Sequence, residues 1–187
     1  MRLTSGQAAP DFTINDVNGQ AITLGDYKGK YLLISFFRYA GCPFCNLTLI
    51  DLIKRYDNFS QRGLQTVAFF QSTDESIDKY VAAKHPPFPV IADPNKTVYS
   101  KYAVESSKLG AVKSIAKAPA VLAGIAKGQV VQGNIDGDGF LMPAQFIIDP
   151  NGVIVKAHYG TDFGDKIPMF DIEEVILTKI PFAGASA

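Results

Sequence analysis

A Cys-Pro-Phe-Cys sequence at residues 42–45 joins two segments of different hydrophobic pattern. The run before it, residues 31–37, is almost continuously apolar, which is typical of a strand buried on both faces. The residues after it, 42–59, place leucine, isoleucine and tyrosine side chains at helical spacing. Pro43 suits the first turn of that helix, because its missing N–H would have no partner there. The cysteines therefore straddle a predicted strand-to-helix junction.

Strands and helices alternate along most of the remaining chain. Asn18-Gly19 lies within an alternating segment, residues 11–24, and predicts a short N-terminal hairpin. A second hairpin is predicted around the turn at residues 150–152. Further strands are expected at 64–70 and 88–92, and helices at 74–84, 95–102 and 171–179. This order predicts an α/β layered sheet with right-handed crossovers.

Residues 105–141 interrupt the alternation and are interpreted as an insertion. We expect one or two short amphipathic helices broken near Pro119, followed by a glycine-rich loop at 128–139. The part dotted with lysines is interpreted as a packed surface helix, with a lid, a dimer contact or a membrane-surface helix as alternatives. Its apolar face consists mostly of alanine and its charge is modest, which argues against strong membrane binding.

Length and charge exclude several classes of protein. The 187 residues are enough for one core, so a single domain spanning 1–187 is expected. Eighteen basic and 18 acidic residues cancel, so no nucleic-acid partner is predicted. The polar N-terminus lacks an apolar signal region, and no run approaches the ~18 apolar residues of a membrane span. We therefore expect a cytoplasmic protein with no membrane partner.

The chain has only two cysteines, Cys42 and Cys45, and a disulfide between them would constrain very little backbone. A role in chemistry therefore explains the presence of the two cysteines better than a contribution to stability does. The unpaired N–H groups at a helix start favour a thiolate, so Cys42 is expected to be the exposed attacking thiol. One helical turn brings Cys45 close enough to act as the buried resolving thiol. Pro43 and Phe44 leave little freedom between them.

Other interpretations of the polar residues are weaker. A zinc site would need four ligands, and the only histidines, His85 and His158, are not paired at ligand spacing. Two inert buried thiols remain an alternative. The segment 134–139 resembles the start of a calcium loop but lacks the acidic residue at the twelfth position, so a tight turn is favoured. His158 is interpreted as a strand-end residue more readily than as a proton shuttle. No metal, nucleotide or organic cofactor is expected.

Two stretches, residues 36–45 and 142–152, together with the order of elements, resemble the thioredoxin-like superfamily, and more narrowly its peroxiredoxin-like AhpC/TSA branch. The resemblance implies a thioredoxin fold: a central mixed β-sheet flanked by helices, with an N-terminal hairpin and the insertion at 105–141. It also implies a cis proline at Pro143 that faces the redox cysteine. An ordinary trans proline at a strand edge is the alternative.

The chain departs from the usual peroxiredoxin pattern at three positions. Cys45 takes the place of the cysteine that attacks peroxide, Cys42 replaces a threonine, Arg38 replaces a proline, and Pro143 falls where an arginine is usual. Arg38 is expected either to replace that arginine's charge or to form a surface ion pair. Gly41 stands where thioredoxins carry tryptophan. These changes move the pattern toward dithiol oxidoreductases.

The sequence therefore predicts a redox protein that cycles Cys42 and Cys45 between dithiol and disulfide. Its substrate is expected to be a protein disulfide or a peroxide, with electrons from a separate thiol reductant. The first alternative is a peroxidase in which Cys45 or Cys42 becomes a sulfenic acid. The second is a non-catalytic redox-sensing domain. A homodimer is compatible with all three.

Overall fold

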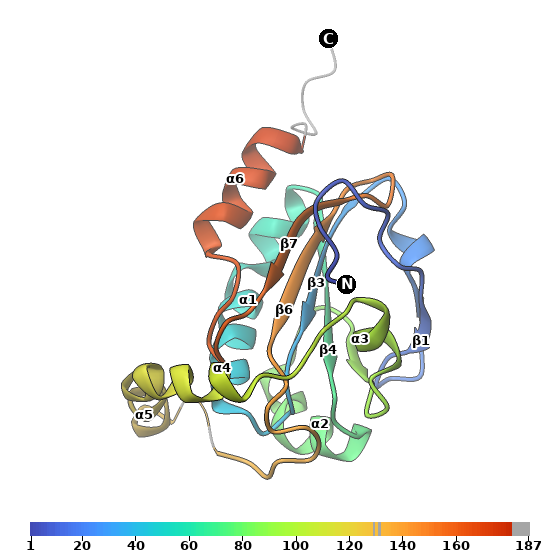
Figure 1. Cartoon of the computed structure of the whole chain (residues 1–187). Coiled ribbons are helices and arrows are strands. Elements are labelled where there is room, and N and C mark those ends of the chain that lie inside the picture. The colour runs from blue at the N-terminus through green and yellow to red at the C-terminus, as the bar shows by residue number, and fades with distance from the viewer. Residues whose placement is uncertain (129, 131, 181–187) are drawn as a thin grey trace.

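A computed structural model describes residues 1–128, 130 and 132–180 of the chain (Figure 1). Residues 129 and 131 of the predicted insertion, and residues 181–187 of the predicted single domain, lie outside the described residues. A five-stranded sheet has the order β5-β4-β3-β6-β7. The neighbours β3, β4 and β5 pair in parallel, whereas β6 pairs antiparallel with both β3 and β7. Its strands are β3 (Tyr31–Phe36), β4 (Leu64–Phe70), β5 (Val90–Ala92), β6 (Ala144–Ile148) and β7 (Ile154–Tyr159). The predicted mixed sheet is confirmed.

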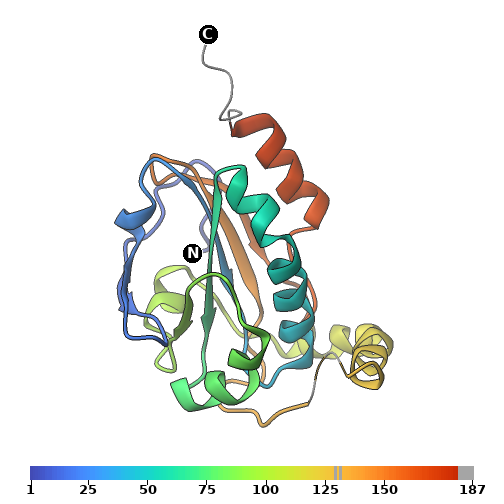
Figure 2. The same ribbon diagram turned by 180° about the vertical axis from the view of Figure 1, so that it is seen from behind.

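Helices cover both faces of this sheet (Figures 1 and 2). The long helix α1 (Pro43–Gln61) and the closing helix α6 (Met169–Lys179) lie on one face. The other face is covered by α3 (Thr97–Lys101) and by the N-terminal hairpin of β1 (Thr13–Asn15) and β2 (Ala21–Thr23). The helix α2 (Asp74–Tyr80) follows β4. Fold class and hairpin agree with the sequence prediction.

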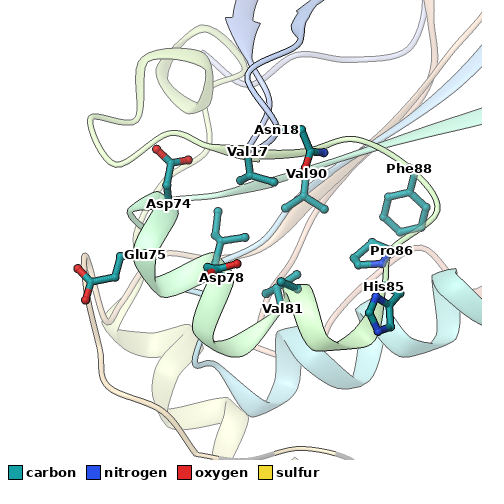
Figure 3. A pocket seen from close by; sticks show the side chains of 12 residues that line it. Val17, Asn18, Asp74, Glu75, Asp78, Val81, His85, Pro86, Phe88 and Val90 are labelled. Atoms are coloured by element: carbon teal, nitrogen blue, oxygen red, sulfur yellow. The ribbon is translucent and has the colours of Figure 1, made fainter.

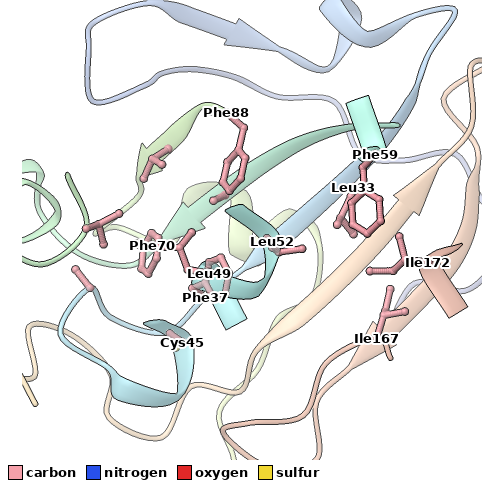
Figure 4. Packing of buried hydrophobic residues seen from close by; sticks show 14 of the residues in the cluster. Leu33, Phe37, Cys45, Leu49, Leu52, Phe59, Phe70, Phe88, Ile167 and Ile172 are labelled. Carbon is pink, nitrogen blue, oxygen red and sulfur yellow. The ribbon is translucent and has the colours of Figure 1, made fainter. Parts of the chain in front are cut away.

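The core is divided by the sheet into two layers, because successive side chains of a strand point to opposite faces. Leu33 and Ile147 pack with α1 and α6, whereas Phe36 and Phe146 pack with α3 and the hairpin. Figure 4 shows Cys45 at one end of the first layer, near Phe37 and Leu49. Both cysteines are therefore buried in this layer of the core.

The insertion begins with two consecutive short helices, α4 (Lys108–Lys113) and α5 (Ala118–Ala126), joined by a 3-10 turn at Ser114–Lys117. We call the whole segment, Lys108–Ala126, the arm. The predicted break near Pro119 lies four residues earlier, at the 3-10 turn, and Pro119 sits in the first turn of α5. In Figure 1 the arm projects from the side of the sheet.

By length and composition alone, the arm is long and apolar enough to cross a membrane. The sequence-based statement that no segment approaches such a span is therefore wrong. The arm contains three lysines and one proline, and Pro119 is tolerated because it lies in the first turn of α5, where its missing N–H would have no partner.

After the arm, residues 132–141 return to the sheet as an extended segment without helix or strand. We call these residues the strap. Its end pairs with the start of the insertion: Ser107 N–H donates to Phe140 O (2.8 Å), and Met142 N–H donates to Glu105 O (3.0 Å). The two ends of the insertion are thus closed against each other at the start of β6.

Candidate active site

Cys42 caps the N-terminus of α1, as the sequence predicted. Its backbone is extended (φ −74°, ψ 117°), and its sulfur accepts a hydrogen bond from the Cys45 N–H at 3.4 Å. This N–H is one of the groups that a helix start leaves without a backbone partner. Pro43 lies in the first turn and contributes no donor that would compete. The helix start therefore directs its partial positive charge at the sulfur of Cys42.

Arg38 lies beneath the pair and is only 3% exposed. Its Nη1 donates to the Cys42 sulfur at 3.3 Å, and its backbone N–H donates to the Cys45 sulfur at 3.4 Å. Its guanidinium also packs on the Phe163 ring, with 3.2 Å between Cζ and the ring centroid. Among the described residues no carboxylate forms an ion pair with Arg38. The anion placed to balance this buried cation is the Cys42 thiolate.

These contacts separate the acidities of the two thiols. Burial opposes ionisation of Cys42, but the Cys45 thiol, the charge of Arg38 and the Cys45 N–H outweigh burial and lower the pKa of Cys42 to about 7. Burial, and then the neighbouring Cys42, raise the pKa of Cys45 well above its ordinary range. Both cysteines are free. At neutral pH the arrangement favours one thiolate, on Cys42, with Cys45 as its protonated neighbour.

Cys42 is not exposed, contrary to the sequence-based expectation. Its exposed fraction is 0%, and that of Cys45 is 2%. The strap lies directly over the cysteine loop: Gly133 N–H donates to Gly41 O at 2.9 Å. A Cβ built on either glycine would lie 2.7 Å from the Cα of the other. The sequence shows two glycines far apart, and only the fold reveals that their backbones touch.

Polar contacts hold the strap in this position. Arg38 Nε donates to Leu141 O at 3.0 Å, and its Nη2 donates to Gly139 O. Gln71 makes two hydrogen bonds to the backbone of Asp138 (2.7 and 3.0 Å). Arg38 therefore binds the strap and the thiolate with the same guanidinium group. The expected surface ion pair of Arg38 is wrong, because the strap covers it.

Ser72 adds a further tether. Its hydroxyl accepts from the Ala40 N–H (2.8 Å) and donates to Asp136 Oδ1 (2.8 Å), so it joins the cysteine loop to the strap. Asp136 and Asp138 were weighed as parts of a calcium loop. In the structure they face Ser72, Gln71 and Ser106 instead.

Pro143 and Cys45 line one small cavity of about 10 Å³, which is about the room one water needs. The peptide bond before Pro143 is trans, so the cis bond implied by the family resemblance is wrong. Met142 N–H donates to Glu105 O, and Pro143 O accepts from Gly160 N–H (2.8 Å). The backbone on both sides of the proline is thus paired within the chain.

A larger cavity of about 430 Å³ lies between α1 and the arm. Phe44, the residue between the two cysteines, lines it and contacts Phe163 edge to face at 6.1 Å. Thr48 and Lys166 line both this cavity and the small one at Cys45. The structure therefore places Phe44 beside the middle of the arm, and Thr48 and Lys166 connect this region to the cavity at Cys45.

Another pocket, of about 440 Å³, lies between α2 and the hairpin (Figure 3). Its lining includes His85 and the acidic residues Asp74, Glu75 and Asp78, but neither cysteine. His158 forms a hydrogen bond with Asp165 at 2.9 Å, a partner the sequence analysis did not identify. Among the described residues, no three His, Cys, Asp or Glu side chains are grouped as a metal site.

Asn46 is a site residue that sequence reasoning missed. Its amide donates to Ala40 O (2.7 Å) and Cys42 O (2.9 Å), which fixes the loop carrying the first cysteine. Its Oδ1 is buried without a hydrogen-bond partner in the described part of the chain. Asn46 directly follows the second cysteine, and that proximity was the one available signal.

Known proteins with similar sequences and structures are redox proteins. The model of the AhpC/TSA family matches residues 5–157. A Mycobacterium tuberculosis protein whose name assigns it provisionally to the peroxiredoxins is 26% identical over 155 residues, covering 83% of this chain and 92% of its own length. The thiol-disulfide oxidoreductase ResA of Bacillus subtilis is 23% identical over 160 residues, covering 85% and 69% respectively. The crystal structure of the peroxidoxin BcpB of M. tuberculosis has a TM-score of 0.66 at 13% identity, covering 95% of this chain and 96% of its own.

Proposed function

The chain belongs to the AhpC/TSA family, and from that premise we propose that it is a thiol-disulfide oxidoreductase in which Cys42 attacks and Cys45 resolves. Its relatives carry the names of peroxiredoxins and of a thiol-disulfide oxidoreductase, so an oxidoreductase working through its thiols is common to both. The observation that carries the finer assignment is that the Cys42 sulfur accepts hydrogen bonds from Arg38 Nη1 and from the Cys45 N–H, which accompanies opposite shifts of the two thiol pKa values.

The reaction follows from these protonation states. The Cys42 thiolate attacks one sulfur of a substrate disulfide, forming a mixed disulfide and releasing the other substrate sulfur as a thiolate. Cys45 then loses its proton, with the released thiolate as a suitable acceptor, and attacks Cys42. The Cys42–Cys45 disulfide forms and the second substrate thiol leaves. The substrate gains two electrons and two protons, and a separate thiol reductant returns the pair to the dithiol.

Arg38 supports this order of events. Its guanidinium stabilises a negative charge on Cys42, at 3.3 Å, more directly than one on Cys45, which faces only its backbone N–H. Because its pKa is lower, Cys42 is ionised to a greater extent than Cys45 at neutral pH, which makes it the attacking thiol. Arg38 therefore takes the role of a cation beside the nucleophile. Pro43 and Phe44 fix the separation of the two sulfurs.

Peroxide reduction is the second candidate function, and access to the sulfurs favours it. The strap covers Cys42, while Cys45 lines a cavity with room for about one water, so a peroxide fits the closed protein better than a protein disulfide does. In this reaction a thiolate attacks one peroxide oxygen, becomes a sulfenic acid and releases an alcohol or water. The other cysteine then displaces water to form the same disulfide.

The deciding experiment compares reduced wild type with Cys42→Ser and Cys45→Ser, each mixed with hydrogen peroxide or with a model disulfide. We expect Cys45→Ser to accumulate a mixed disulfide on Cys42, identified by mass spectrometry. Peroxide is expected to react with wild type no faster than with a free thiol. Stopped-flow kinetics measure both rates.

Two results would reject this assignment. Rapid sulfenic acid formation on Cys45 in Cys42→Ser would make the protein a peroxidase with the family's usual nucleophile. Stoichiometric oxidation without turnover, whichever thiol reductant is supplied, would make it a redox sensor. The cytoplasmic location and the possible homodimer stay predictions that these assays leave open.

A further inference from the structure

The arm exposes a large apolar surface. Of the large hydrophobic side chains that are exposed in the described chain, five belong to the arm, and four of these are 64–70% exposed. They are Leu109, Val112, Ile115, Leu122 and the less exposed Ile125. The sequence analysis interpreted the apolar face as mostly alanine and favoured a packed surface helix. The structure instead directs the alanines and the larger aliphatic residues outward together.

The arm meets the body of the protein through small residues. Gly110 lies against Met142, and Gly124 lies against Leu47 of α1, where an added Cβ would come within 3.1 Å. The Ser114 hydroxyl accepts a hydrogen bond from the Phe163 N–H at 2.7 Å. These contacts fix the arm along the protein surface, so it cannot leave the body to span a bilayer while they persist. Its larger side chains are left on the outward side.

The arm also carries a local positive charge. Lys108, Lys113, Lys117 and Lys127 lie in or directly after it, and no acidic residue occurs between positions 106 and 135. Lys117 pairs with Asp162 at 2.9 Å. The other three are exposed and form no ion pair with any residue that the structure describes. Since the whole chain has no net charge, this basic segment is a distinct feature of one side of the molecule.

Charge argues against a second copy as the occupant of this face. A two-fold interface brings the same patch of both copies together, so the lysines would face lysines without acidic partners in the patch. Composition argues against a protein partner. Aromatic residues, methionine and arginine are enriched in protein interfaces and lysine is depleted, whereas this face has aliphatic residues and lysines only. Aliphatic side chains flanked by lysines are typical of helices that lie in the surface of an anionic membrane.

We propose that the outward face of the arm is a docking surface for an anionic phospholipid bilayer. The aliphatic side chains enter the boundary between headgroups and acyl chains, and Lys108, Lys113 and Lys127 contact lipid phosphates. The arm lies along the bilayer without crossing it. This proposal replaces the expectation of no membrane partner and goes beyond the redox function, since it needs neither cysteine.

Behind the proposed docking face, a cavity separates the arm from the start of α1. The cavity of about 430 Å³ between α1 and the arm is lined by Phe44 on one side and by Lys117 and Val121 of the arm on the other.

The test is a flotation assay of the full reduced chain with vesicles of phosphatidylcholine, with and without phosphatidylglycerol. We expect binding only to the anionic vesicles, weakening as salt is added. Leu122→Glu and the pair Lys113→Glu/Lys127→Glu should each weaken binding by about tenfold or more, since each places negative charge against anionic lipid. Cys42→Ser should bind like wild type, which separates this test from that of the redox function.

Matched controls come from α1 and α6. Leu177 is 64% exposed, the same as Leu122, so Leu177→Glu adds the same charge to an equally exposed site outside the arm. Lys54→Glu reverses an exposed charge on α1. Both should bind anionic vesicles like wild type. Circular dichroism confirms that each variant remains folded.

Three outcomes would overturn the proposal. The first is no binding to anionic vesicles, or equal losses for Leu122→Glu and Leu177→Glu. The second is a dimer in sedimentation that Leu122→Glu converts to a monomer, which would assign the face to a second copy. The third is retention on immobilised polyglutamate without vesicle binding, which would assign it to an acidic protein.

Discussion

The two halves of the insertion, the arm and the strap, turn opposite kinds of residue toward the body of the protein. The arm keeps its small residues against the body and leaves its large aliphatic side chains outside. The strap is rich in glycine and aspartate and turns its backbone and polar groups inward, over the cysteine pair. One half leaves an apolar surface exposed. The other half removes the reactive sulfur from the surface.

The difference lies in what holds each half. Hydrogen bonds and the close glycine contact tether the strap, and of its three hydrophobic residues Ile135 and Phe140 are exposed, while Leu141, at its last position, is buried. A segment held mainly by polar contacts opens at lower cost than one held by buried apolar area. We therefore expect the strap to open when Cys42 reacts with a large substrate, while the arm keeps its place on α1.

Gly133→Ala should produce the largest effect on the strap. The new Cβ would lie 2.7 Å from the Gly41 Cα and 2.8 Å from the Tyr80 ring, so the closed position is overpacked. Overpacking costs about 1–3 kcal/mol. The open population then rises by about 5- to 150-fold. The measurement is the rate at which a bulky maleimide labels Cys42.

Gly139→Ala is the matched control within the strap, because its Cβ would meet only Ile135, at an ordinary 3.6 Å. It should label at the wild-type rate. Equal labelling of Gly133→Ala and wild type would mean that the strap is not what shields Cys42.

Arg38→Met should have the next largest effect, on the nucleophile. In wild type the pKa of Cys42 is lowered to about 7, so about half of the thiol is ionised at pH 7. Without the cation the pKa of Cys42 rises, because burial then opposes ionisation with only the Cys45 hydrogen bonds against it, and the thiolate fraction at pH 7 falls several-fold. The pH profile of labelling by iodoacetamide should shift upward with little change in its high-pH plateau.

Arg38→Met should also change how the stability of the reduced protein depends on pH. Because folding lowers the pKa of Cys42, its ionised form stabilises the reduced protein above the ordinary thiol pKa, and this contribution is lost as pH falls through about 7. Reduced wild type should therefore gain stability from about pH 7 to about pH 8.5, and Arg38→Met should gain less. Parallel profiles for the two proteins would exclude Arg38 as a cause of the lowered pKa of Cys42.

The contrast between arm and strap also marks the limit of what the sequence predicts. The apolar run at residues 31–37 predicts the central strand, and the helical spacing that follows it at 42–59 predicts α1 with Cys42 at its start. These features can be predicted because each depends on residues that are neighbours in the chain. The burial of Cys42 depends on Gly133, 91 positions away, and on tethers from Gln71 and Ser72. Such contacts join residues that are far apart in the chain, and they leave no periodic pattern in the sequence from which they could be predicted.

Ser72→Ala tests the polar tethers with a smaller effect. It removes the acceptor of the Ala40 N–H and the donor to Asp136, whose second oxygen already has no partner in the described structure. We expect a loss of about 1–2 kcal/mol in the free energy of unfolding, measured in urea, and faster hydrogen exchange at Ala40. Ser100→Ala, which removes an exposed hydroxyl on α3, should change stability by less than about 0.5 kcal/mol. An equal effect of the two variants would mean that Ser72 does not hold the strap.

Leu122→Ser should have the smallest effect of these variants on the free energy of unfolding, and this small effect tests whether anything covers the arm in solution. A side chain that is 64% exposed has little buried area to lose, so the free energy of unfolding should stay within about 0.5 kcal/mol of wild type. Val121→Ala, one residue earlier but buried against the body, should cost about 1 kcal/mol. Urea unfolding of both variants at two protein concentrations makes the comparison. A larger loss for Leu122→Ser than for Val121→Ala, growing with protein concentration, would mean that a second copy covers the arm, because only association makes an outward leucine contribute to stability.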